Sequence, residues 1–153
     1  MKRLAIIAAL LATPAGAMNV PGPSETDCLV AVVYHESRGE SDEGKHAVIE
    51  VVLSRMDDPR WPASACAVVR QPHQFEFVTN GRWPEMTDVA AIENARRVVR
   101  TALTIWSMPK ARRANGFANG ADHFHSGPKP YWANRMPQVT RIDGHRFYRE
   151  NER

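Results

Sequence analysis

One carboxyl group stands out in the sequence because of the residues that share its side of a predicted helix. The pattern of residues predicts a helix over about 26–37. Steps of 100° per residue place Leu29, Val32, Val33 and Glu36 on one stripe of it. Desolvation in such a setting raises the pKa of a carboxyl group. Glu36 could therefore hold a proton near neutral pH and donate it to a leaving oxygen as a general acid.

A structural role for the same residue is the alternative hypothesis. A carboxylate on an apolar stripe must be paired, exposed or protonated. Glu36 could form a salt bridge with Arg38 or Arg55, or the end of its helix could fray into water. The periodicity of the apolar residues does not distinguish these structural roles of Glu36 from that of a general acid.

Aromatic side chains outside the predicted helices could form a groove for a sugar. Ring faces stack on pyranose rings, and an amide such as that of Gln74 could bind an N-acetyl group. The alternative is packing of a small sheet onto the helices, which we expect for Phe147 and in part for Phe124. The loops and short strands contain the rings of Phe75, Phe124, Tyr131, Trp132, Phe147 and Tyr148.

The six histidines suggest a different chemistry. His123 and His125 are separated by one residue, as in some metal sites, and His35, His73 or His145 could add a third ligand. The sequence contains no His-Glu-x-x-His motif. We therefore predict no metal and no other cofactor, and keep a metal-dependent amidase or peptidase as the alternative.

Helices followed by short strands must position these residues. Ser41 is predicted to cap a second helix over about 42–56, and a third helix is predicted over about 87–107. Short strand-like segments follow, and Asp143-Gly144 joins two of them as a hairpin. This order predicts an α+β fold, mainly helical with a small antiparallel sheet.

The side-chain pattern also predicts which helix faces are buried. In the second helix Ala47, Val48, Val51 and Val52 form the expected buried face, with Glu43, His46 and Glu50 on the solvent side. In the third helix the expected apolar side consists of Val89, Ile92, Ala95, Val99, Ala102, Leu103 and Trp106.

The N-terminus resembles an export signal. Lys2-Arg3, an apolar run over 4–12 and the small residues Ala15-Gly16-Ala17 follow the order of such signals, and nine apolar residues are too few to span a bilayer. We predict a signal peptide over 1–17, an extended leader over 18–25 and one catalytic domain over 26–153. The product would lie in the periplasm, the cell envelope or the medium, without stable membrane insertion.

Export would permit a disulfide between Cys28 and Cys66, with two reduced buried thiols as the alternative. It would also place nucleotide cofactors out of reach. An exported enzyme of this size is therefore expected to perform hydrolytic or lytic chemistry.

The basic balance of the chain does not require a nucleic-acid partner. Lys and Arg number 20 and Asp and Glu 17, a formal charge of +3, which falls to about +1 without the signal. We expect a monomer that binds no nucleic acid, with Glu93 and Arg97 paired at i,i+4. The clustered cations are expected to be a solvated surface, and they are Arg96, Arg97, Arg100, Lys110, Arg112 and Arg113.

The segment Tyr34-His35-Glu36-Ser37-Arg38-Gly39-Glu40 resembles the signature of the SleB-type cell-wall hydrolases, Tyr-x-Glu-Ala-Arg-Gly-Glu. The resemblance spans Cys28 to about Tyr148. This chain departs from the usual pattern at four positions: it has Ser37 where the family usually has Ala, Glu50 where Gln is usual, Ser54 where Asn is usual, and Phe124 where Tyr is common. The resemblance continues in order through residues 47–55, 61–62, 66–69, 74–77, 122–125, 130–133 and 142–148.

This resemblance implies a lysozyme-like fold and cleavage of peptidoglycan between N-acetylmuramic acid and N-acetylglucosamine. It maps the catalytic glutamate of the family onto Glu36, with glycan strands as the partner. Because no other carboxylate combines a position in the signature with an apolar setting, we expect Glu36 to act as the single acid and base of a lytic transglycosylase. The residues expected to contact the strand are Gln74, Phe75, His125, Tyr131 and Trp132. A non-catalytic wall-binding protein is a further alternative.

Overall fold

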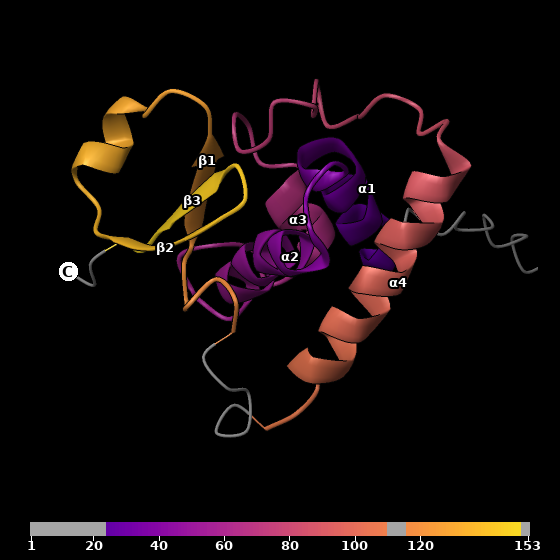
Figure 1. The fold of residues 1–153 in the computed structure, drawn as a ribbon, viewed down its shortest axis with the longest axis horizontal. Coiled ribbons are helices and arrows are strands. Elements are labelled where there is room, and N and C mark those ends of the chain that lie inside the picture. The colour runs from indigo at the N-terminus through magenta and orange to yellow at the C-terminus, as the bar shows by residue number, and fades with distance from the viewer. Residues whose placement is uncertain (1–23, 110–115, 151–153) are drawn as a thin grey trace, which may run out of the picture.

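The computed structural model describes residues 24–109 and 116–150. The predicted signal peptide, most of the leader and the basic residues Lys110, Arg112 and Arg113 lie outside them. Within the described residues a group of helices packs beside a small sheet (Figure 1). The elements in chain order are α1 (Glu25–Ser37), α2 (Asp42–Met56), α3 (Ala65–Val69), α4 (Val89–Trp106), β1 (His123–Ser126), the 3-10 helix η2 (Tyr131–Asn134), β2 (Gln138–Ile142) and β3 (His145–Tyr148).

Helix α1 begins earlier than the sequence predicts. Its cap is Ser24, whose hydroxyl accepts a hydrogen bond from the N–H of Asp27 at 3.1 Å. The carboxylate of Asp27 accepts in return from the N–H of Ser24 at 3.2 Å. This reciprocal capping box makes Ser24 the cap of α1, so the helix begins at Glu25, within the segment predicted as the leader.

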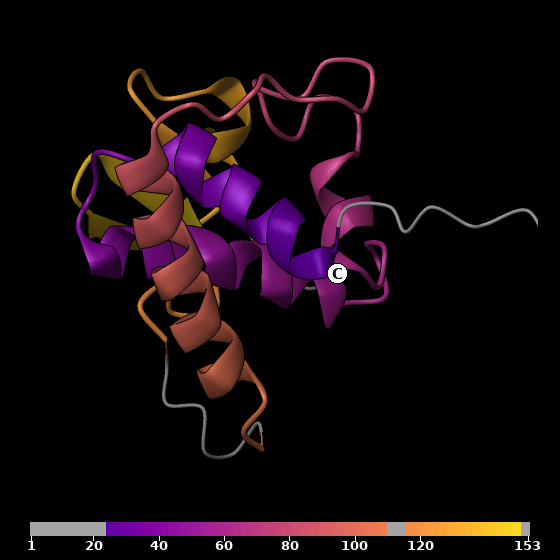
Figure 2. The ribbon, with the colours of Figure 1, turned by 90° about the vertical axis from the view of Figure 1, so that its right-hand side faces the viewer.

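Helix α1 is the centre of the core. It packs against α2, α3 and α4, and the views in Figures 1 and 2 show the other helices around it. Every residue from Cys28 to Tyr34 is buried. The single apolar stripe predicted for this helix was therefore too narrow, because neighbours cover the middle of α1 on all sides.

Helix α2 has the predicted cap and bounds, but its expected solvent face is wrong at two positions. Ser41 caps it through the N–H of Gly44 at 3.1 Å. His46 is buried, and the carboxylate of Glu50 accepts from the N–H groups of Phe117 and Ala118 at 3.2 and 2.7 Å. The chain after α4 folds back over this face, and Glu50 satisfies its backbone donors.

Helix α4 lies against α1 and α2 along one side (Figure 2). The buried side is confirmed at Ala95, Val99 and Ala102, whereas Val89, the first helical residue, is 71% exposed. The predicted Glu93–Arg97 pair is wrong. Arg97 pairs with Asp42 of α2 at 2.7 Å, and Glu93 pairs with Arg96.

The three strands form an antiparallel sheet in the order β1-β3-β2. The hairpin predicted at Asp143-Gly144 is confirmed, with Asp143 in the left-handed region at φ 48°. Phe147 and Phe124 face the helices from one side of the sheet, and Phe147 is fully buried. The predicted α+β architecture is thereby confirmed.

The disulfide joins the start of α1 to α3. Cys28 and Cys66 are bonded with their Cα atoms 5.2 Å apart, which confirms the predicted pairing. The short helix α3 was not predicted. Ser64 caps it, and Glu25 of α1 accepts a hydrogen bond from the N–H of Cys66 at 3.0 Å.

None of the helices between residues 24 and 109 or between 116 and 150 has both the length and the apolar character needed to span a bilayer.

Candidate active site

Glu36 lies in the last turn of α1, partly buried beside the core. Burial raises the pKa of its carboxyl group from 4.5 to about 7, and the nearby negative charge of Glu76 adds to the rise. Arg38 donates to the hydroxyl of Tyr34, and Arg55 donates to the backbone oxygen of Asp122. Among the described residues, Glu36 has no ion pair with either arginine.

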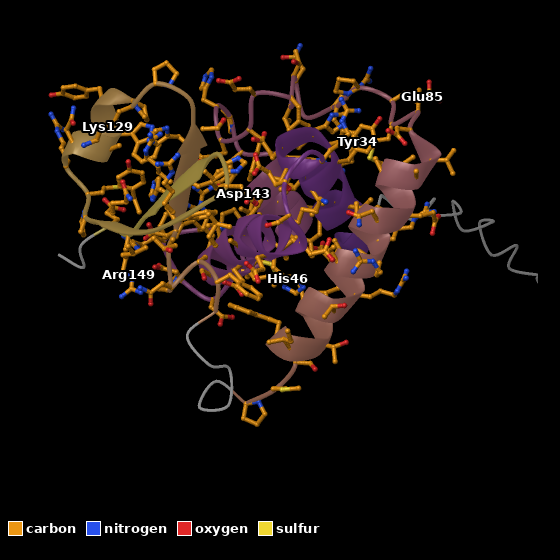
Figure 3. The ribbon with its side chains drawn as sticks, viewed as in Figure 1. Tyr34, His46, Glu85, Lys129, Asp143 and Arg149 are labelled. Carbon is orange, nitrogen blue, oxygen red and sulfur yellow. A yellow bond between two sulfur atoms is a disulfide. The ribbon has the colours of Figure 1, made fainter. Side chains whose placement is uncertain are left out.

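Tyr34 anchors this end of α1 to the start of α4. Its hydroxyl accepts hydrogen bonds from the N–H groups of Thr87 and Asp88 at 3.3 and 3.2 Å and from Arg38 at 3.2 Å. These donors lower the pKa of the Tyr34 hydroxyl, with the Asp88 N–H as the largest cause. Figure 3 shows Tyr34 close to the segment that leads into α4. The position of Glu36, two residues further on, is therefore fixed from the α4 side.

A series of ring contacts leads from the residue before Glu36 to the sheet. His35 stacks on Phe77, with ring centroids 4.6 Å apart, and Phe77 contacts Phe75 at 5.8 Å. Phe75 contacts Phe124 of β1 at 6.3 Å, and Phe124 contacts His145 of β3 at 5.3 Å. We name these five rings the aromatic series. It connects the end of α1, the segment over 74–78 and the inner face of the sheet.

The five predicted groove residues do not gather in one place. Gln74 is exposed beside the aromatic series, whereas Phe75 is only 4% exposed and packs in the core. Burial corrects the interpretation of Phe75 as a ligand-stacking ring. Its side chain packs between Phe77 and Phe124 instead.

Two of the other three groove residues, His125 and Trp132, belong to the opposite face of the sheet, and Tyr131 precedes Trp132 in η2. His125 alternates with Phe124 along β1, so the two side chains point to opposite faces. The ring of His125 stacks on Tyr148 at 5.5 Å, and Trp132 of η2 closes over both. Tyr131, which is 74% exposed, receives a hydrogen bond from Arg135 at its hydroxyl.

The remaining carboxylates of the region act as acceptors. Asp143 accepts from Ser41, Glu40 accepts from the N–H of Gly144, and Asp122 accepts from the N–H of Glu150. Glu76 is exposed and affects Glu36 through its charge. Sequence reasoning did not identify this effect, although the segment Gln74-Phe75-Glu76-Phe77 was already singled out.

The histidines are partnered separately. His123 lies 2.8 Å from a carboxylate oxygen of Asp122, and His125 lies 3.1 Å from the hydroxyl of Tyr148. In the part of the chain that the structure describes, no three His, Cys, Asp or Glu side chains gather closely enough to share one metal ion.

A hollow of about 1020 Å³ lies elsewhere, at the C-terminal end of α2. Arg60 crosses it and pairs with Asp58, Asp122 and Glu150. Neither Glu36 nor any predicted groove residue lines it. We therefore do not assign the catalytic site to this hollow, despite its size.

Comparison with known proteins connects this arrangement to enzymes of the bacterial cell wall. The profile of the Cell Wall Hydrolase family matches residues 39–148, beginning just after Glu36. The spore cortex-lytic enzyme of Oceanobacillus iheyensis is 33% identical over 134 residues, which cover 85% of this chain and 44% of that protein. The enzyme of the same name from Bacillus subtilis is 31% identical, over 86% of this chain and 40% of its own length. The chain thus spans less than half of these relatives.

Solved structures show the same fold. The catalytic domain of the Bacillus cereus SleB protein is 26% identical, with a TM-score of 0.62, over 88% of this chain and 99% of that domain. The catalytic domain of SleB from Bacillus anthracis, described as a germination-specific lytic transglycosylase, is 23% identical with a TM-score of 0.65, over 87% of this chain and 100% of that domain. The lysozyme-like α+β fold is thereby confirmed. Since the family profile covers more than two thirds of the chain, the protein belongs to the cell wall hydrolase family.

Proposed function

We propose that this protein is an exported, monomeric lytic transglycosylase that cleaves peptidoglycan between N-acetylmuramic acid and N-acetylglucosamine. The observation that carries the proposal is Glu36, which lies at the end of a buried helix without an ion pair among the described residues and has a pKa of about 7. Such a carboxyl group is protonated near neutral pH, as a general acid must be. Membership of the cell wall hydrolase family and the likeness to spore cortex-lytic enzymes support the choice of substrate.

A single carboxyl group is sufficient for this reaction. Glu36 donates its proton to the glycosidic oxygen as the bond from that oxygen to C1 of the muramyl residue breaks. The carboxylate then removes the proton of the muramyl C6 hydroxyl, whose oxygen bonds to C1 and closes a 1,6-anhydro ring. Glu36 is protonated again at the end, so no water is consumed. Glu76 contributes by keeping the pKa of Glu36 high.

The predicted substrate contacts divide along the glycan strand. Gln74 is exposed beside the aromatic series, where its amide would meet an N-acetyl group near Glu36. His125 and Trp132 lie on the opposite face of the sheet, Tyr131 precedes Trp132 in η2, and the three would contact only sugars further from the cleaved bond.

Mass spectrometry of the products tests the proposal. Purified peptidoglycan digested by the protein is expected to yield muropeptides with 1,6-anhydro ends, lighter by one water than the products of hydrolysis. Products with reducing muramic acid ends would overturn the transglycosylase reaction and indicate a muramidase. Release of peptides from intact glycan strands, lost on adding a chelator, would indicate a metal-dependent amidase or peptidase.

The pKa of Glu36 predicts how activity depends on pH. Because the acid must be protonated, the rate of lysis should fall as pH rises through about 7. Glu76→Gln removes the like charge that raises this pKa, so its activity should fall at a lower pH than in the wild type. Initial rates between pH 5 and 9 would measure both midpoints. A wild-type rate that rises through pH 7 to 8 would contradict a protonated Glu36.

A further inference from the structure

The turn of the β2–β3 hairpin lies directly against the turn that joins α1 to α2. A carboxylate oxygen of Asp143 accepts from the N–H of Ser41 at 2.9 Å and from its hydroxyl at 2.6 Å. In the other direction, a carboxylate oxygen of Glu40 accepts from the N–H of Gly144 at 3.2 Å. Figure 3 shows Asp143 at the end of the hairpin nearest the helices. Each turn thus supplies a carboxylate to the other.

Two glycines permit this close approach. A Cβ atom at Gly44 would lie 2.6 Å from a carboxylate oxygen of Asp143, closer than real Cβ contacts allow. A Cβ atom at Gly144 would lie 3.0 Å from a carboxylate oxygen of Glu40. A side chain at either glycine would therefore crowd the carboxylate of Asp143 or Glu40 that takes part in these hydrogen bonds.

The residue after Gly144 connects this contact to the aromatic series. His145 is 2% exposed, and its Nδ1 lies 3.8 Å from Glu40, too far for a hydrogen bond. Burial is the largest effect on the imidazole of His145 and holds its pKa below the usual range. The charges of Asp143 and His125 also act on this ring. The neutral ring of His145 packs against Phe124, from which the aromatic series leads to His35. Glu40 therefore binds Gly144, the residue before His145 at one end of the aromatic series. At the other end, His35 directly precedes Glu36 in the chain.

We propose that Glu40 is a positioning residue, which fixes the aromatic series beside Glu36 by binding the hairpin to the end of α1. The inference deepens the proposed function and rests on Glu36 as the acid. Glu40 itself contacts neither the substrate nor the reacting proton. It acts through the backbone of Gly144 and the rings beyond it.

Two substitutions at Glu40 and one matched control test this role. Glu40→Ala removes the acceptor for the Gly144 N–H, whereas Glu40→Gln keeps an amide oxygen there and removes only the charge. Glu43→Ala is the control, since Glu43 is exposed on α2 and makes no hydrogen bond or ion pair among the described residues. All three retain Glu76 and His35, the titratable groups beside Glu36.

Glu40→Ala is expected to lower kcat about 10-fold or more with little change in KM. It should also move the alkaline fall of the pH–rate profile to lower pH by about one unit, because water that enters around a loosened aromatic series lowers the pKa of Glu36. Glu40→Gln and Glu43→Ala should retain wild-type values of both. A purely structural role would reduce the folded fraction without moving the midpoint of the profile.

An NMR titration of Glu36 separates this inference from the proposed function. Glutamate labelled with 13C at the carboxyl carbon, assigned by its loss in Glu36→Gln, reports the pKa of Glu36 without any substrate. A lowered pKa in Glu40→Ala but not in Glu40→Gln supports the positioning role, even if the protein fails to cleave peptidoglycan. An unchanged pKa and kcat in Glu40→Ala would overturn it while leaving Glu36 as the acid. Equal shifts in both variants would also overturn it, since charge alone would then explain them.

Discussion

Glu36→Gln is expected to reduce the lytic activity on purified peptidoglycan by a factor of at least about 1,000. General acid–base catalysis commonly contributes 10²–10⁴-fold, and the proposed reaction uses this one group for both proton transfers. Glutamine has nearly the same shape but cannot donate or remove a proton in this way. Release of soluble muropeptides, measured beside wild type and Glu43→Ala, gives the comparison. Activity within 10-fold of wild type would show that Glu36 is not the acid.

The same substitution is expected to lower activity but to raise the free energy of unfolding at alkaline pH, so stability provides a second measurement. Because the pKa of Glu36 is about 7 in the folded protein and 4.5 when unfolded, the unfolded chain releases this proton first as pH rises. Glu36 therefore favours the folded state most at low pH, and that contribution is lost between about pH 4.5 and 7. Glu36→Gln removes this loss, so at pH 8 its free energy of unfolding should exceed that of the wild type, by at most about 3 kcal/mol.

Urea unfolding at pH 4.5 and pH 8 measures this difference. The variant should be close to wild type at the lower pH and more stable at the higher pH. A variant less stable at both would point to Glu36 as a structural carboxylate, the alternative that the sequence leaves open.

Removing the disulfide is expected to have the largest effect on stability. The bond between Cys28 and Cys66 closes a loop with a sequence separation of 38, for which chain entropy corresponds to about 4 kcal/mol. The double variant Cys28→Ala/Cys66→Ala should lower the free energy of unfolding by a similar amount. The reduced wild type should fall with it, since both lose the same constraint on the unfolded chain.

Urea unfolding with and without dithiothreitol tests this result. Dithiothreitol should shift the midpoint of the wild type and leave that of the double variant unchanged, because no disulfide remains to reduce. Equal midpoints for oxidised wild type and double variant would contradict the expected contribution of the bond.

Local sequence signals predicted the elements that depend on nearby residues. Ser41 caps α2, and Asp143-Gly144 forms the hairpin turn, because the hydrogen bonds and backbone conformations that define them lie within a few positions. The unusual position of Glu36 could likewise be predicted from the helical pattern of its neighbours. A carboxyl group on an apolar stripe is unusual whichever element that stripe packs against.

Features set by distant parts of the chain could not be predicted in this way. The partners of Glu50 lie 67 and 68 positions away, so nothing near Glu50 distinguishes it from a solvated glutamate. Similarly, an aromatic residue in a strand faces either the core or the outside, and the one-residue offset between Phe124 and His125 places them on opposite faces. The sequence pattern identifies the rings but not the face that each one lines.

The burial of the middle of α1, from Cys28 to Tyr34, has a consequence for how the protein unfolds. Every side chain of this segment is covered, so its amide protons should exchange with deuterium only through global unfolding. Glu36 follows this segment in the last turn of α1, so the acid is attached directly to the part of the chain expected to exchange most slowly. Partial unfolding of the rim, at α4 or the hairpin, could expose the surroundings of the acid while the helix that carries it stays folded.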